Sequence, residues 1–287
     1  MRIGFDCARF KPPIVAGCLL GAALAPAFAA DVSPWDNDLR SSARLIAASA
    51  IEVSGSRVFR AGIELKLRPG WKTYWRYPGD SGVPPAFDFS ESSNVKTVTV
   101  LFPAPKRFED GSGGTSIGYG GEVILPLRVI AQDAGKPVTL RMKLAYAACE
   151  KLCVPAKAEA ALVLTGAETA FDAALAAAEA RVPKLGRVGD TGEPAVRAVT
   201  RETGPGKPRI VVDLAAPPGV PVDLFVEGPT AAWALPLPKP VAGAPAGLRR
   251  FVFELDGLPP GAKPDGAVLR LTGMAGDQAV EAAFRLD

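Results

Sequence analysis

The sequence predicts an all-β protein made of two β-sandwich domains joined by a single α-helix. Most segments alternate between apolar and polar residues and are rich in Val, Ile, Leu, Phe and Thr, which is typical of half-buried strands. Turn residues separate these segments at short intervals, which favours a sandwich over a parallel α/β sheet. One alanine-rich segment, residues 168–182, departs from this pattern and has the composition of a helix.

The chain begins with a segment typical of a secretory signal peptide, residues 1–29. Its positively charged start contains Arg2, Arg9 and Lys11, and an apolar stretch follows at residues 12–25. The small residues Ala27-Phe28-Ala29 then form a cleavage site. A lipoprotein cleavage box that ends at Cys18 is the alternative interpretation. No later segment approaches the ~20 apolar residues that a membrane span needs. We therefore expect a mature chain without a membrane span, located in the periplasm.

The first domain is predicted over residues 35–165. Its expected strands are 44–52, 59–67, 71–76, 86–89, 96–102, 123–131, 138–147 and 156–164. Glycine and proline separate them at residues 69–70, 78–79, 111–114 and 135–137. Short, evenly spaced strands of this kind are typical of a sandwich.

A helix, a linker and a smaller second domain are predicted to follow. Segment 168–182 has no glycine or proline and is long enough for about four turns. Glycine-containing residues 183–194 are expected to be a linker, so that residues 166–194 connect the domains. The strands of the second domain, residues 195–287, are predicted at 195–202, 209–215, 222–227, 249–255, 268–272 and 279–286. We expect segment 234–245 to be irregular surface, and this domain to be structural or to dock a partner.

The composition excludes several classes of function. The chain contains no histidine, which removes Ser-His-Asp and Cys-His catalysis and the zinc sites built on His-Glu-x-x-His. Its formal net charge is +3, without the basic clusters that nucleic acid requires. No Walker-type phosphate loop is present. We therefore expect protein partners, no nucleic acid and no cofactor.

Two closely spaced cysteines, Cys149 and Cys153, are the strongest candidates for a functional site. Cys7 and Cys18 leave with the predicted signal peptide, so these two are the thiols of the mature chain. If residues 150–152 form a hairpin turn, the two cysteines face each other across it. A ring this short removes little chain entropy, which favours a redox role over a structural disulfide. A Cu(I) site formed by the same two thiolates is the alternative, because zinc would need four ligands.

Several motifs resemble a known family. They are residues 70–85 (GWKTYWRYPGDSGVPP), 102–108 (FPAPKRF), 118–126 (GYGGEVILP) and the cysteine segment from Tyr146 to Pro155. Together they resemble the amino-terminal periplasmic region of the thiol:disulfide interchange protein DsbD, most closely in the ScsB (suppressor of copper sensitivity) branch. The resemblance is specific over about residues 43–163.

This resemblance implies an immunoglobulin-like sandwich whose dithiol relays electrons. The expected partners are a separate membrane electron-transfer protein and thioredoxin-like periplasmic oxidoreductases. Cys149 and Cys153 match the redox cysteines of the family, and Tyr74 matches an aromatic position beside them. The remaining candidates for the wall or cap of the site are Phe108, Glu109, Asp110, Tyr119 and Tyr146. The expected cap loop, residues 110–114, lacks the bulky aromatic that shields the cysteines in enteric members, so Phe108 or Tyr119 would have to replace it.

The residues around the dithiol support three further expectations. Lys151 is the nearest positive charge and acidic residues oppose it, so we expect an ordinary thiol pKa near ~8.5. The exposure expected on the hairpin favours Cys149 as the attacking thiol. Strand alternation places Trp71 and Trp75 on one face, expected to be core, and Tyr74 on the other.

Overall fold

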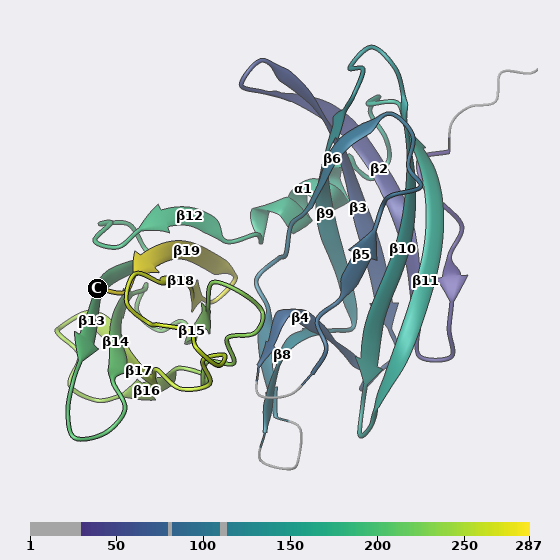
Figure 1. The fold of residues 1–287 in the computed structure, drawn as a ribbon. Coiled ribbons are helices and arrows are strands. Elements are labelled where there is room, and N and C mark those ends of the chain that lie inside the picture. Colours follow the sequence, from purple (N-terminus) through teal and green to yellow (C-terminus); the bar gives the residue numbers. More distant parts are fainter. Residues whose placement is uncertain (1–29, 80–81, 110–113) are drawn as a thin grey trace, which may run out of the picture.

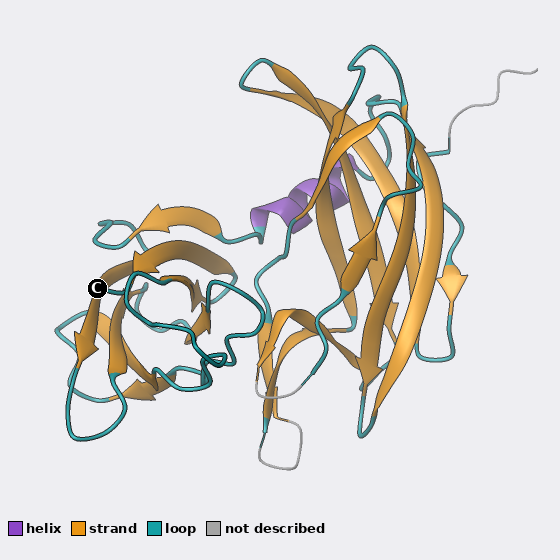
Figure 2. Ribbon diagram, viewed as in Figure 1, coloured by secondary structure: helices purple, strands orange, loops and turns teal. Residues whose placement is uncertain are grey.

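The structure, a computed structural model, describes residues 30–79, 82–109 and 114–287. The regular secondary structure of these residues is almost all strand, with one α-helix among them (Figure 1, Figure 2). The all-β fold class is thereby confirmed. The predicted signal peptide, residues 1–29, lies outside the described residues. No helix within the described ranges is long and apolar enough to cross a membrane.

The first β unit, residues 36–164, consists of two facing sheets. Five strands pair in the order β1-β2-β3-β9-β6, and the second sheet runs β11-β10-β4-β8-β7, with β5 paired to β10. The strands are β1 (Asp36–Asn37), β2 (Ser41–Val53), β3 (Ser56–Leu67), β4 (Lys72–Gly79), β5 (Ala86–Asp88), β6 (Val95–Val100), β7 (Lys106–Glu109), β8 (Thr115–Gly120), β9 (Glu122–Ala131), β10 (Val138–Cys149) and β11 (Cys153–Leu164). All eight strands predicted in this region are present, and β1, β7 and β8 are additional.

The core of this unit follows from alternation along its strands. On β10, Val138, Leu140, Met142, Leu144 and Tyr146 are all buried, because every second side chain points to the same face of a sheet. They pack with the inward residues of β2, β3 and β9 in one cluster. The residues between them, such as Arg141 and Lys143, are exposed. This face of β10 therefore fixes the register in which the strand reaches Cys149.

Helix α1 (Asp172–Ala180) packs on the five-stranded sheet and is shorter than predicted. The backbone N–H of Thr169 donates to the Asp172 carboxylate at 2.8 Å, so the chain is held in a turn just before the helix begins. Arg60 on β3 forms ion pairs with Asp172 at 3.2 Å and Glu179 at 2.8 Å, while Leu175 is fully buried. These contacts attach the helix to the first unit.

The second β unit, residues 184–285, consists of two four-stranded sheets. Their orders are β12-β19-β18-β15 and β13-β14-β17-β16. The strands are β12 (Lys184–Arg187), β13 (Ala195–Glu202), β14 (Arg209–Ala215), β15 (Val222–Glu227), β16 (Lys239–Val241), β17 (Leu248–Glu254), β18 (Val268–Ala275) and β19 (Gln278–Arg285). A separate apolar cluster, which includes Phe251 and Leu271, lies within this unit.

Two predictions for this half of the chain were wrong in part. The expected linker 183–194 contains β12, which pairs in parallel with β19 and so belongs to the second unit. The expected irregular segment 234–245 contains β16, and its Leu235 and Leu237 are buried. Both strands are three or four residues long, too short for an alternating pattern to stand out.

Candidate redox site

The two cysteines lie at the end of the longest hairpin in the second sheet. Strands β10 and β11 pair residue by residue from Val138 opposite Leu164 to Cys149 opposite Cys153, and residues 150–152 form the turn. This confirms the predicted hairpin. The Cα atoms of Cys149 and Cys153 are 4.1 Å apart, and their sulfur atoms form a disulfide bond.

The two sulfur-bearing residues differ sharply in exposure. Cys149 is buried, with 8% of its surface accessible, whereas Cys153 is exposed. Leu152, next to Cys153 in the turn, is 78% exposed. Because thiol–disulfide exchange requires an incoming sulfur to reach its target, we expect a partner to reach Cys153, the more exposed of the two residues. The expectation that exposure favours Cys149 was therefore wrong.

Tyr74 on β4 lies directly against the disulfide, on the outer face of the sheet. Its Oη is 2.9 Å from Cys153 Sγ and 3.3 Å from Cys149 Sγ. The disulfide sulfurs carry no proton, so the tyrosine hydroxyl is the donor in this contact. Tyr74 forms a small cluster with Ala147 and Cys149, while its neighbour Trp75 is fully buried in the core. The predicted opposite orientation of Tyr74 and Trp75 is confirmed.

Neighbouring backbone fixes the position of the Tyr74 ring. The Thr73 hydroxyl donates to the Ala147 carbonyl at 2.9 Å, which ties β4 to β10 one residue before Tyr74. On the other side, a Cβ atom on Gly82 would lie 2.5 Å from the Tyr74 ring, so only glycine permits this approach. Sequence reasoning missed Gly82, although its place in a Gly-Val-Pro-Pro segment is a sign of constrained backbone.

The other aromatic candidates lie in two different places. Phe108 on β7 is half-buried beneath Lys72, whose Nζ is 4.8 Å from the ring centroid, and Lys72 pairs directly with Cys149. Tyr119 and Tyr146 instead belong to the core cluster. The Tyr119 hydroxyl donates to the Pro103 carbonyl at 2.7 Å, and the Tyr146 hydroxyl lies 2.7 Å from Ser41 Oγ. The structure thus brings Phe108 near the dithiol strands but places Tyr119 and Tyr146 in the interior.

Burial governs the ionisation of these two tyrosines. It raises the pKa of Tyr119 well above its usual value. Burial also raises the pKa of Tyr146, although the hydrogen bond with Ser41 opposes that change. Both phenols are therefore neutral at physiological pH and contribute packing rather than charge.

The charged residues near the site are arranged differently from the expectation. Glu109 is exposed at the end of β7, and its backbone carbonyl accepts a hydrogen bond from Lys72 Nζ at 3.5 Å. Asp110 lies outside the described residues. Lys72 was missed by sequence reasoning, which named Lys151 as the nearest positive charge. Trp71 is half-buried before β4, with Arg40 5.5 Å from its ring centroid, so the core prediction for the tryptophans is confirmed for Trp75 alone.

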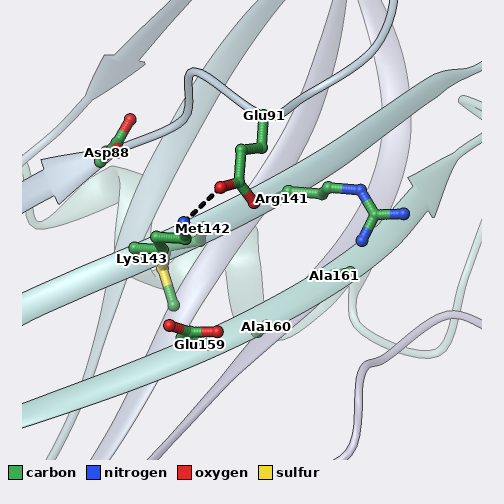
Figure 3. Close-up of a pocket in the computed structure, with 8 residues that line it drawn as sticks. All are labelled: Asp88, Glu91, Arg141, Met142, Lys143, Glu159, Ala160 and Ala161. Atoms are coloured by element: carbon green, nitrogen blue, oxygen red, sulfur yellow. Dashed lines mark hydrogen bonds and ion pairs between the residues drawn. The ribbon is translucent and has the colours of Figure 1, made fainter.

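A surface pocket elsewhere on β10 and β11 is separate from this site. It has a volume of about 230 Å³ and is lined by Asp88, Glu91, Arg141, Met142, Lys143, Glu159, Ala160 and Ala161 (Figure 3). Two of its lining residues, Lys143 and Glu91, form an ion pair (Figure 3). Neither cysteine lines it. Within the described part of the chain, no cluster of three or more His, Cys, Asp or Glu residues is placed to hold a metal ion.

Comparison with known proteins identifies the region that carries the site. Residues 43–165 match the family model described as "Thiol:disulfide interchange protein DsbD, N-terminal". We call residues 43–165 the DsbD region. This DsbD region contains Cys149, Cys153 and Tyr74, and spans the first β unit from β2 to β11.

The fold extends beyond the DsbD region. The crystal structure of the N-terminal periplasmic domain of ScsB from Proteus mirabilis matches with a TM-score of 0.67 and 20% sequence identity. The match covers 89% of this chain and 98% of that chain, so the second β unit is part of the shared fold. No curated protein matches the sequence closely enough to count as a relative. The DsbD match and the Cys149–Cys153 disulfide support a role in thiol–disulfide exchange.

Proposed function

We propose that this chain is a periplasmic thiol–disulfide relay. It accepts electrons from a membrane or thioredoxin-like partner and reduces oxidised periplasmic proteins through Cys149 and Cys153. The observation that carries the proposal is the cross-strand disulfide between an exposed and a buried cysteine, inside a region that matches the DsbD amino-terminal model. An exposed disulfide at a hairpin end offers one sulfur to a partner while the β framework around it stays in place.

The proposed reaction has two exchange steps. In the reduced chain, the Cys153 thiolate attacks a client disulfide, forms a mixed disulfide, and releases one client thiolate, which takes a proton from water. The Cys149 thiolate then attacks Cys153 Sγ, which re-forms the Cys149–Cys153 bond and releases the second client thiolate. The client gains two electrons and the relay loses two. A reduced donor restores the dithiol by the same steps in reverse.

The proposed domain organisation follows the sequence. Residues 1–29 are a signal peptide, and residues 35–165 and 195–287 form two immunoglobulin-like sandwiches. Strand β12 is added to the second sandwich, and the segment that contains α1 connects the two. Support comes from the two pairs of sheets and their two apolar clusters. In this arrangement the first sandwich carries the dithiol.

Exchange with an oxidised thioredoxin-like protein tests this function. The reduced chain is mixed with that protein, and alkylation followed by mass spectrometry counts the free thiols of both. We expect one Cys149–Cys153 disulfide to form for each client disulfide reduced. If the reduced chain binds Cu(I) tightly and transfers no electrons, the copper-chaperone alternative replaces the relay. If activity in cells persists with serine at both positions, the chain is an adaptor with a structural disulfide.

Tyr74→Phe is expected to slow this exchange several-fold. The hydroxyl that lies 2.9 Å from Cys153 Sγ can donate to the thiolate that forms or leaves during each step, and hydrogen bonds to a charged group stabilise it. Phenylalanine keeps the ring against Gly82 and removes only the donor. The measurement is the rate constant of exchange by stopped-flow tryptophan fluorescence. An unchanged rate would show that the ring alone forms the wall of the site.

A further inference from the structure

One edge strand of the second β unit contacts strands of the first unit that border the redox site. Strand β15 is the terminal strand of its four-stranded sheet, and its alternate residues Asp223, Phe225 and Glu227 all contact the first β unit. Alternate residues of a strand share a face. This face of β15 therefore packs against the first β unit.

The contacts of this face are specific and well aligned. Asp223 accepts hydrogen bonds from Arg107 Nε at 2.9 Å and Nη2 at 2.7 Å. Glu227 accepts from Arg76 Nε at 3.0 Å and Nη2 at 2.7 Å. Bidentate arginine–carboxylate pairs fix orientation as well as distance. Between them, the ring centroids of Phe225 and Trp75 are 5.8 Å apart.

The contact is built like a protein interior rather than a loose docking surface. Phe225 is 1% exposed and belongs to the core cluster of the first β unit. Glu281 on β19 forms a second ion pair with Arg76. Burial by itself would lower the pKa of Arg76, but hydrogen bonding and charge from Glu227 and Glu281 raise it above its usual value. Arg76 thus stays charged and paired.

The anchored residues lie next to the residues of the redox site. Arg76 is two residues after Tyr74 on β4, and Tyr77 donates from its hydroxyl to the Leu235 carbonyl at 2.6 Å. Arg107 precedes Phe108 on β7. Strand β4 pairs with β10 at Cys149, so a shift of β4 changes the position of Tyr74 relative to both sulfurs. Figure 1 shows the end of the sheet with β4 and β8 facing the second β unit.

We propose that the second β unit is a positioning element of the redox site. Through Asp223, Phe225 and Glu227, β15 holds β4 and β7 so that the Tyr74 hydroxyl stays against Cys149 and Cys153. This inference rests on the proposed thiol–disulfide exchange. It assigns a role to a unit that carries no cysteine of its own.

The test compares two matched carboxylate pairs in the full chain. Asp223→Asn weakens the ion pair with Arg107. The control, Asp213→Asn, weakens a bidentate pair with Arg250 inside the second unit, in which both hydrogen bonds are 2.7 Å long. Two quantities are measured: the rate constant of exchange with a thioredoxin-like protein, and the equilibrium of Cys149–Cys153 with glutathione. We expect Asp223→Asn to lower the rate constant about tenfold, as small misplacements of reacting groups do, and to shift the glutathione equilibrium. Asp213→Asn should change neither.

A charge exchange separates positioning from simple loss of stability. The double variant Arg107→Asp, Asp223→Arg restores an ion pair, and we expect its rate constant to return to within about threefold of wild type. If Asp223→Asn unfolds the chain, Glu227→Gln replaces it, because Glu281 still neutralises Arg76. Equal effects of Asp223→Asn and Asp213→Asn, or no effect of either, would overturn the inference. If the wild-type chain itself transfers no electrons, the proposed function fails, whereas the glutathione equilibrium of the variants still tests positioning.

Discussion

Replacing Cys149 with serine is expected to trap a mixed disulfide between Cys153 and an oxidised thioredoxin-like partner. The exposed Cys153 thiolate can still attack, but no second thiol remains to release the partner. Replacing Cys153 with serine should instead abolish reaction, because Cys149 is only 8% exposed and sits beneath Tyr74. The measurement is the yield of cross-linked species on a non-reducing gel after mixing equal amounts of each variant and partner.

The double variant with serine at both positions is the control for non-specific cross-linking. Reduction of the gel samples should cleave the mixed disulfide and separate the two proteins. The two single variants are matched in chemistry and differ only in which thiol remains. If Cys153→Ser traps the partner as well as Cys149→Ser does, the exposure difference does not decide the attacking sulfur, and the order of the two proposed steps is wrong.

Phe225→Ala is expected to lower the free energy of unfolding by about 3–5 kcal/mol, the usual range for removing a buried phenylalanine ring. The side chain is 1% exposed and packs against Trp75, so its loss opens a cavity between the two β units. Equilibrium denaturation in guanidinium chloride, followed by circular dichroism, measures this change.

Phe284→Ala is the matched control, because Phe284 is also a phenylalanine of the second β unit but is only half-buried. A half-exposed ring loses less transfer free energy on truncation, so we expect its cost to be less than half as large. A cost below about 1 kcal/mol for Phe225→Ala would mean that the contact between the units is not a continuous core. The slope of the unfolding transition would then also reveal separate melting of the two units.

Most of the first β unit could be predicted from sequence because its long strands alternate clearly. The hairpin at Cys149 and Cys153 follows from two such strands separated by three residues, and its register is observed as expected. The position of Tyr74 on the outer face follows from the same alternation. These features depend on local pattern, which the sequence carries directly.

Strands β7 and β8 could not be predicted in this way. A Cβ atom on Gly118 in β8 would lie 1.9 Å from the Thr73 carbonyl oxygen, so glycine is required there by the close approach of β4. Glycine nevertheless lowers strand propensity when read from sequence alone. Strand β12 is four residues long and depends on pairing with β19. In each case a tertiary contact, rather than local preference, decides the structure.

The exposure of the cysteines was also beyond sequence reasoning. Both residues flank the same short turn, and Cys149 is buried in a cluster with Tyr74 and Ala147. Gly82 and Lys72 approach the site through neighbouring chain segments whose placement depends on the complete sheet. The contact between β15 and β4 depends on residues about 150 positions apart, a separation that no local pattern reports.

In the proposed relay, the bond between Cys149 and Cys153 opens and closes reversibly while the β fold persists. Equilibration in graded glutathione buffers, with differential alkylation and mass spectrometry, measures this directly, and circular dichroism follows the fold in the same samples. We predict a two-electron midpoint within about −120 to −270 mV, the range of exchange-active couples, with an unchanged β spectrum. A midpoint below about −300 mV, as structural disulfides have, or loss of the β spectrum on reduction, would contradict the claim.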